Sequence, residues 1–168
     1  MHPFPALVDS WKAISVFPGW TVPHPLTGYI RFQCPLEIGG VTEAGLMLKG
    51  GTYSTRPECH VTIELFVLIP GLRLPLMRID WKGDGHSNRR NLGPKELAGQ
   101  RFPGTHLHAF ELNWVADENR MRKSNLPVAM GISEELQSFA DLRTFVGNRF
   151  KISNIDVVET PPWSYLLI

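Results

Sequence analysis

Three histidines of this chain have the residue type and spacing that chemistry would require: His86, His106 and His108. Residues two apart in a strand project from the same face about 7 Å apart, so His106 and His108 can address one metal ion or one substrate. His86 lies in the glycine-flanked segment 83–88, which a hairpin would fold over the same end of the sheet. We therefore expect the three imidazole rings to form one site.

General acid–base catalysis is the first chemistry that this set allows. Imidazole titrates near neutral pH, so His106 or His108 is predicted as the base and His86 as the acid in cleavage of a phosphodiester bond. Four cations close by in the sequence would stabilise the developing negative charge. They are Arg78, Arg89, Arg90 and Lys95. The leading hypothesis is a phosphodiester-directed hydrolase, for example an RNase-like toxin, that works without a cofactor.

A metal site is the second chemistry that the histidines allow. Neutral imidazoles are common zinc ligands, and Asp80 or Asp84 offers a carboxylate nearby in the sequence. One coordination position left to water would supply a nucleophile at neutral pH. A metalloenzyme with histidine ligands for a divalent ion is therefore an alternative hypothesis.

A third hypothesis gives the histidines a structural role. Histidines at sheet ends also form hydrogen bonds to backbone groups, and these three would then order the loop 82–101. That loop contains five basic and two acidic residues. In this case the protein binds nucleic acid or an acidic protein surface, such as a host partner that a mobile-element protein inhibits.

The segments Arg78-Ile79-Asp80, His86-Ser87-Asn88, 104–110 and 150–155 form a recognisable set. This set resembles the sequence pattern of a family of small uncharacterised bacterial proteins that prophages and mobile elements often carry. The resemblance implies that the three histidines act together, in a context of phage or defence biology. It implies no particular activity.

The composition is that of a folded protein with one core. The chain has 168 residues, of which 43% are hydrophobic and 20% charged, with a formal net charge of +1. These values exclude a disordered or fibrous chain and predict one domain over residues 1–168. The near-neutral balance argues against a protein whose whole surface binds nucleic acid, while a local basic patch stays compatible with it.

Cysteine usage and the amino terminus indicate the cytoplasm. Cys34 and Cys59 stand 25 positions apart without a second cysteine near either, so we interpret them as buried thiols in a reducing compartment. The first residues lack the features of a secretory signal, and no apolar run approaches the about 20 residues of a membrane helix. We expect a cytoplasmic protein that does not span a membrane.

Hydrophobic periodicity predicts the elements that position the histidines. Helical spacing predicts a helix over residues 6–16, within an amino-terminal arm of residues 1–27 that packs on the sheet. Alternation of apolar and polar residues predicts strands over residues 29–34, 59–69, 72–81 and 105–116. Pro75 indicates an edge or a bulge within its strand.

The carboxy-terminal part of the chain predicts one more helix and further strands. Ser133, followed by two glutamates, is a favourable helix start, and Gly147-Asn148 a favourable end. Strands are predicted over residues 155–158 and 163–168. The fold class that we expect is α+β, a mainly antiparallel sheet with two or three short helices.

Overall fold

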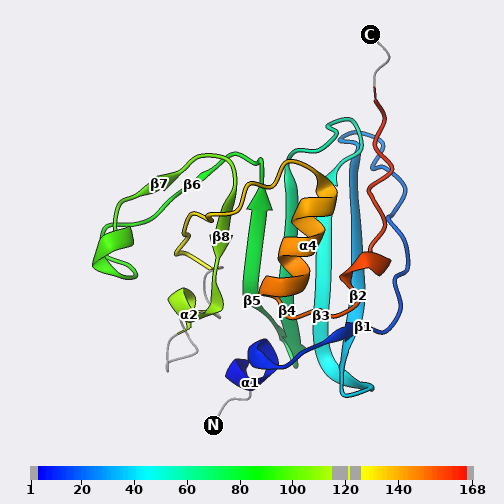
Figure 1. Cartoon of the computed structure of the whole chain (residues 1–168), viewed down its shortest axis with the longest axis horizontal. Helices are drawn as coiled ribbons and strands as arrows, with labels where there is room; N and C mark the ends of the chain where they lie inside the picture. The colour runs from blue at the N-terminus through cyan, green and yellow to red at the C-terminus, as the bar shows by residue number, and fades with distance from the viewer. Residues whose placement is uncertain (1–3, 115–120, 122–125, 166–168) are drawn as a thin grey trace.

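The computed structural model describes residues 4–114, 121 and 126–165 of the chain. Its main sheet consists of β1 (Ala13–Ile14), β2 (Tyr29–Ile38), β3 (Val41–Tyr53), β4 (Val61–Ile69), β5 (Leu72–Trp81) and β8 (His106–His108). These six strands pair antiparallel in the order β1-β2-β3-β4-β5-β8. A two-stranded ribbon of β6 (His86–Ser87) and β7 (Arg101–Phe102) projects beside them (Figure 1).

Helices are short and few in the described part of the chain. They are α1 (Phe4–Asp9), α2 (Phe110–Asn113) and α4 (Phe139–Arg149), with 3-10 turns η1 (Lys95–Leu97) and η2 (Ile155–Val157). The molecule is thus the single α+β domain that composition and periodicity predict. No helix among the described residues is long and apolar enough to cross a membrane.

One face of the main sheet carries the apolar core, and α4 lies across it (Figure 1). Side chains point to this face at every second position of each strand, as the pleat of a strand requires. The buried side chains include Phe32, Cys34, Leu36, Leu46, Leu48, Ile63, Leu65, Ile79 and Leu107 from the sheet, and Leu142 and Val146 from α4.

The opposite face, which we call the polar face, carries two rows of side chains across the strands. The first row, from β2 to β8, is Arg31, Gly51, Thr62, Asp80 and His106. The second row is Gln33, Lys49, Glu64, Arg78 and His108. Both rows therefore end at a histidine of β8, at the edge of the sheet.

The hairpin of β4 and β5 agrees most closely with the sequence prediction. β5 has the predicted bounds, and β4 begins at Val61 rather than at Cys59 because His60 adopts a positive φ of 52° in the preceding turn. The pairing register shifts between Leu65 and Phe66, where Phe66 lies opposite Pro75. The bulge expected at this proline is therefore confirmed.

β2 and β3 form a longer hairpin than the sequence indicates. β2 extends four residues past position 34, and the periodicity does not predict β3 at all. Glycines interrupt the alternation of β3 because their neighbours in β2 need the space. A Cβ atom at Gly50 would overlap the ring of Phe32, and one at Gly51 would overlap the hydroxyl group of Tyr29.

The prediction of a helix over residues 6–16 is wrong beyond Asp9. α1 ends there, and the chain joins the sheet as β1. The buried ammonium group of Lys12 donates to three carbonyl groups between residues 7 and 10, which are the acceptors that the end of a helix leaves without partners.

The prediction of a strand over residues 105–116 is wrong beyond His108. The chain turns into α2 because the buried amide of Asn113 donates to the carbonyls of Ala109 and Val128 and accepts the Val128 N–H. Residues 115 and 116 lie outside the described part of the chain.

The carboxy-terminal helix exists but begins later than predicted. α4 starts at Phe139 instead of Ser133 because Ser138 and Asp141 form a capping box, and it continues to Arg149. The two predicted strands are wrong. Residues 155–157 form η2 and residues 163–165 belong to no strand, while residues 166–168 lie outside the described part.

The two cysteines differ in environment. Cys34 is buried as expected, whereas Cys59 is half-buried, and both are free thiols. Burial raises the pKa of the Cys34 thiol to about 12.

Candidate functional site

β6 and β8 bring the three predicted histidines together. One ring nitrogen from each of His86, His106 and His108 lies within 4.8 Å of those of the other two, so the group could hold a metal ion. The ring centroids of His86 and His108 are 4.8 Å apart, and those of His106 and His108 are 5.1 Å apart. His106 and His108 are buried and His86 is half-buried. The predicted convergence is confirmed, and the predicted roles of acid and base stay a prediction.

The pairing of β8 with β5 positions two of the histidines. In this antiparallel register His106 lies opposite Asp80, and His108 lies opposite Arg78. The side chains of directly paired residues project from the same face of a sheet. The register of β5 against β8 therefore places a carboxylate and a guanidinium group beside the two imidazoles.

Asn88 positions the third histidine. Its buried amide group donates to the carbonyls of Leu97 and Ala129 and accepts the Ala129 N–H at 2.8 Å. These bonds tie the ribbon of β6 and β7 to the chain segment that follows residue 126. His86 precedes Asn88 by two residues and is held over β8 by this anchor.

Two of the histidines use one ring nitrogen to bond a backbone carbonyl. The Nε2 atom of His86 lies 3.0 Å from the Pro127 carbonyl, and the Nδ1 atom of His106 lies 2.8 Å from the Gly104 carbonyl. A ring nitrogen must carry hydrogen to bond a carbonyl oxygen. In the neutral rings this leaves Nδ1 of His86 and Nε2 of His106 with free electron pairs.

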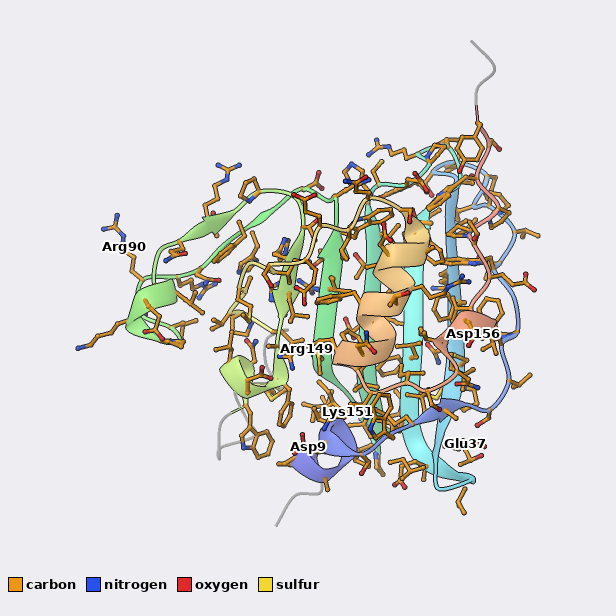
Figure 2. All side chains as sticks on the ribbon, viewed as in Figure 1. Asp9, Glu37, Arg90, Arg149, Lys151 and Asp156 are labelled. Atoms are coloured by element: carbon orange, nitrogen blue, oxygen red, sulfur yellow. The ribbon has the colours of Figure 1, made fainter. Side chains whose placement is uncertain are left out.

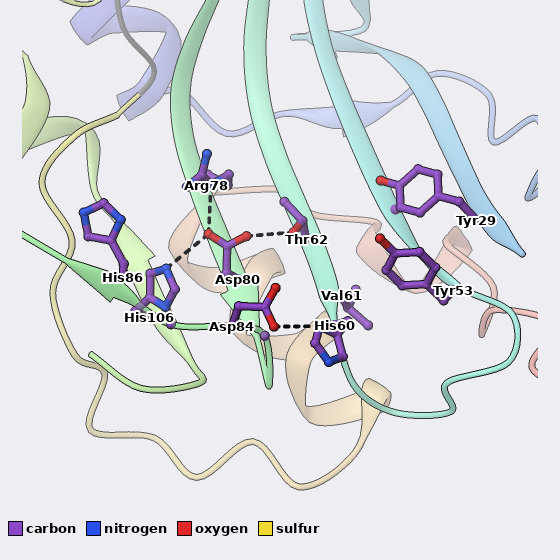
Figure 3. Close-up of a pocket in the computed structure, with 13 residues that line it drawn as sticks. Tyr29, Tyr53, His60, Val61, Thr62, Arg78, Asp80, Asp84, His86 and His106 are labelled. Carbon is purple, nitrogen blue, oxygen red and sulfur yellow. Dashed lines mark hydrogen bonds and ion pairs between the residues drawn. The ribbon is translucent and has the colours of Figure 1, made fainter. Parts of the chain in front are cut away.

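Several polar groups of the site lie around the carboxylate of Asp80 (Figure 3). Its Oδ2 atom lies 2.8 Å from Nε of Arg78, 3.3 Å from Nε2 of His106 and 3.5 Å from Nε2 of His108. Its Oδ1 atom accepts the hydroxyl hydrogen of Thr62 at 2.7 Å. Burial alone would raise the pKa of Asp80, but the histidines, Arg78 and Thr62 hold that pKa well below its usual range.

His108 is completely buried and has one ring nitrogen without a partner. A terminal nitrogen of Arg78 lies 2.9 Å from its Nε2 atom, and because guanidinium groups only donate, Nε2 accepts this bond. The Nδ1 atom of His108 has no hydrogen-bond partner among the described residues. Burial lowers the pKa of His108 to about 4, so the ring is neutral near pH 7.

A cavity of about 360 Å³ opens beside the cluster. His86, His106, Arg78 and Asp80 line one side of it, and Tyr29, Tyr53, His60 and Asp84 are among the residues that line the rest (Figure 3). Asp84, the second carboxylate considered as a metal ligand, pairs instead with His60 at 3.8 Å. Of the two carboxylates, the structure therefore places Asp80 at the histidines.

The four predicted phosphate-binding cations divide into two groups. Arg78 contacts His108 directly, and Arg89 lines a hollow of about 280 Å³ that Arg78 and His86 also line. Arg90 is exposed and projects from the ribbon, away from the main sheet (Figure 2). Lys95 is exposed in η1 and lines none of the cavities described at the cluster.

Sequence reasoning missed the residues that hold the site together. Thr62 and Asn88 carry no chemical signal of their own, because their importance lies in bonds to residues distant in the sequence. Thr62 does follow the alternation of β4, which places it on the same face as the histidines. Thr62 could have been predicted as a site residue from this alternation.

Comparisons of the chain with models of protein families, with curated proteins and with solved structures gave no match. The resemblance to small prophage and mobile-element proteins therefore stays a hypothesis, and the site is interpreted from its geometry.

Proposed function

We propose that the protein is a divalent-metal-dependent hydrolase of phosphodiester bonds, with His86, His106 and His108 as ligands of the ion. The observation that carries this proposal is the convergence of three imidazole nitrogens within 4.8 Å. Bonds from the second nitrogen to the carbonyls of Pro127 and Gly104 support it, because metal-binding histidines are commonly oriented in this way.

A metal ion accounts for the contacts of the cluster better than metal-free acid–base catalysis does. Each ring nitrogen of His106 faces an oxygen atom, Nδ1 that of Gly104 and Nε2 that of Asp80. A cation bound between Nε2 and the carboxylate of Asp80 is therefore electrostatically favoured. His108 is completely buried, so a substrate cannot approach its ring for direct proton transfer.

The spacing of the polar atoms fits a small divalent ion. Ligand atoms around a tetrahedral zinc ion lie about 3.3 Å apart, given zinc–nitrogen bonds of about 2.0 Å. The Oδ2 atom of Asp80 lies 3.3 Å from Nε2 of His106. The widest histidine separation, at most 4.8 Å, would close through side-chain rotation.

Asp80 and Arg78 would also take part in the proposed hydrolysis. An ion with three imidazole ligands lowers the pKa of a bound water to about 7. Asp80 would orient a water at the ion by accepting a hydrogen bond from it, and Arg78 would neutralise the charge that develops on the phosphate. The cavity of about 360 Å³ has room for the phosphodiester group.

The test is metal content and hydrolysis, measured on protein purified without a histidine tag. We expect elemental mass spectrometry to detect about one zinc or manganese ion per chain. We also expect hydrolysis of bis(p-nitrophenyl) phosphate that a chelator removes and the ion restores. His86→Ala, at a half-buried position where little packing is lost, should abolish both the bound ion and the activity.

His24→Ala is the matched control, because His24 is an exposed loop residue distant from the cluster in the sequence. This variant should keep the ion and the activity. Protein that holds no ion, or hydrolysis that persists in His86→Ala, would contradict the proposal. A bound ion without hydrolysis of any phosphodiester would contradict the proposal that the protein is a hydrolase.

A further inference from the structure

We propose that the polar face of the main sheet binds single-stranded RNA and leads it to the histidine cluster. This inference rests on the proposed function, since it names the substrate that the hydrolase would cut. The polar face is defined by the two cross-strand rows that end at His106 and His108. Its use as a binding surface follows from its shape, its charge and its aromatic side chains.

Three neighbouring hollows that share lining residues form a path along the face. The cavity at the cluster shares Tyr29, Gly51 and Thr62 with a second hollow of about 680 Å³ that extends over β2 and β3. On its other side it shares Arg78 and His86 with the hollow near Arg89. From β8 to β2 this path crosses four strand spacings, or about 19 Å. About five nucleotides fit at the stacked spacing of about 3.4 Å.

The charge of the face favours a polyanion. Four cations stand along the face and its cavities against three carboxylates, Glu64, Asp80 and Asp84. The cations are Arg31, Lys49, Arg73 and Arg78. Glu64 is already paired with Lys49 and Arg73, and Asp80 with Arg78. Arg31 is exposed and forms no ion pair with any described residue, so it is the cation most available to a phosphate.

Two aromatic rings stand at the far side of the cavity from the histidines (Figure 3). Tyr29 and Tyr53 face each other across β2 and β3 with ring centroids 5.3 Å apart, and Tyr29 is 38% exposed. Gly51 leaves the space that the Tyr29 ring occupies. Exposed rings stack on unpaired bases, and their hydroxyl groups, like the amide of Gln33, can bond the 2′-hydroxyl of RNA.

Binding is tested by fluorescence anisotropy with a labelled, unstructured RNA of about 12 nucleotides, within the usual range of single-strand sites. A chelator is present, so that cleavage is suppressed. Arg31→Gln should weaken binding about fivefold and reduce the slope of log affinity against log salt by about 0.7. Tyr29→Leu should weaken binding about fivefold or more while leaving the salt slope unchanged.

Arg149→Gln is the matched control, because Arg149 belongs to α4 on the other face of the sheet (Figure 2). It should bind RNA as the unchanged protein does. Equal binding by Arg31→Gln, Tyr29→Leu and the control would overturn the RNA surface even if phosphodiester hydrolysis is present. Equal affinity for DNA of the same sequence would overturn RNA as the ligand. Arg31-dependent binding of RNA without any cleavage would support the surface and overturn the hydrolase.

Discussion

Asp80 links the side chains of the site to one another. Its Oδ2 atom contacts Arg78, His106 and His108, and its Oδ1 atom contacts Thr62. Thr62 and Arg78 each donate to one oxygen of this carboxylate and fix its orientation toward the imidazoles. Thr62 therefore influences the proposed ion through Asp80, without a hydrogen bond of its own to the histidines.

Thr62→Val tests this influence at the level of one hydroxyl group. Valine keeps the shape of threonine but leaves Oδ1 of Asp80 without its donor. We expect metal affinity to fall about 10-fold, the lower end of the effect of changing residues that surround the ligands of an ion. Affinity is measured by competition with a coloured chelator. Thr144→Val, at an exposed position of α4, should bind the ion normally. Unchanged affinity in folded Thr62→Val would show that Asp80 does not orient the ligands.

The histidine pair could be predicted from the sequence because strand parity is a local property. Two residues that are two apart face the same side, whatever the rest of the chain does. The carbonyl that orients His86 could not be predicted, since Pro127 lies 41 positions away. The same holds for the bond of Arg78 to His108, which depends on how β8 registers against β5.

The start of α4 shows two local signals in competition at the scale of an element. Ser133 is the cap predicted from the sequence, and the structure uses Ser138, five residues later. A helix from Phe139 buries Phe139, Leu142 and Val146 against the sheet. Tertiary packing thus decides between two caps that propensity alone cannot rank.

Asp141→Asn should reveal this cap through the pH dependence of stability. Backbone and hydroxyl donors of Ser138 lower the pKa of Asp141 below its ordinary value of 3.8 in the folded protein. The carboxylate therefore stabilises the fold above that ordinary value, and this contribution disappears as the pH falls through the lower, folded-state pKa. The melting temperature of the variant should be below that of the unchanged protein at pH 7, and the two should converge in acid. A constant difference across this range would contradict the role of the charge.

The hairpin of β4 and β5 could be predicted, whereas β3 could not. Apolar and polar residues alternate over part of each of its two strands, which Pro70-Gly71 joins, so pattern and turn agree. In β3, Gly50 and Gly51 replace side chains at the positions that Phe32 and Tyr29 occupy from β2. When side chains of the neighbouring strand occupy the space above its glycines, a strand shows little alternation in its own sequence.

At the scale of the whole molecule, a formal net charge of +1 conceals a strong separation of surfaces. One face of the main sheet is apolar and covered by α4 (Figure 1), and the other gathers charged groups and histidines. The ribbon of β6 and β7 contributes His86 to the cluster at the edge of the polar face. The site is thus assembled from the sheet and from a separate unit that Asn88 anchors.

Asn88→Ala should loosen that assembly. Its loss leaves the buried N–H and carbonyl of Ala129 without the bonds that Asn88 supplies, so the free energy of unfolding should fall by about 1–3 kcal/mol. Metal affinity should fall as well, because the ribbon no longer holds His86 over β8. Urea denaturation and chelator competition measure the two effects. Asn148→Ala, at an exposed position of α4, should change neither. Lower stability with unchanged metal affinity would show that the anchor does not position His86.

The contrast between the two thiols makes the molecule convenient to label. Cys34 is sealed in the core with its pKa raised to about 12, so maleimide dyes should leave it untouched near neutral pH. Cys59 is half-buried and adjoins His60 in the cavity wall. A fluorophore attached there would report the entry of ligands into the natural protein, with no mutation needed.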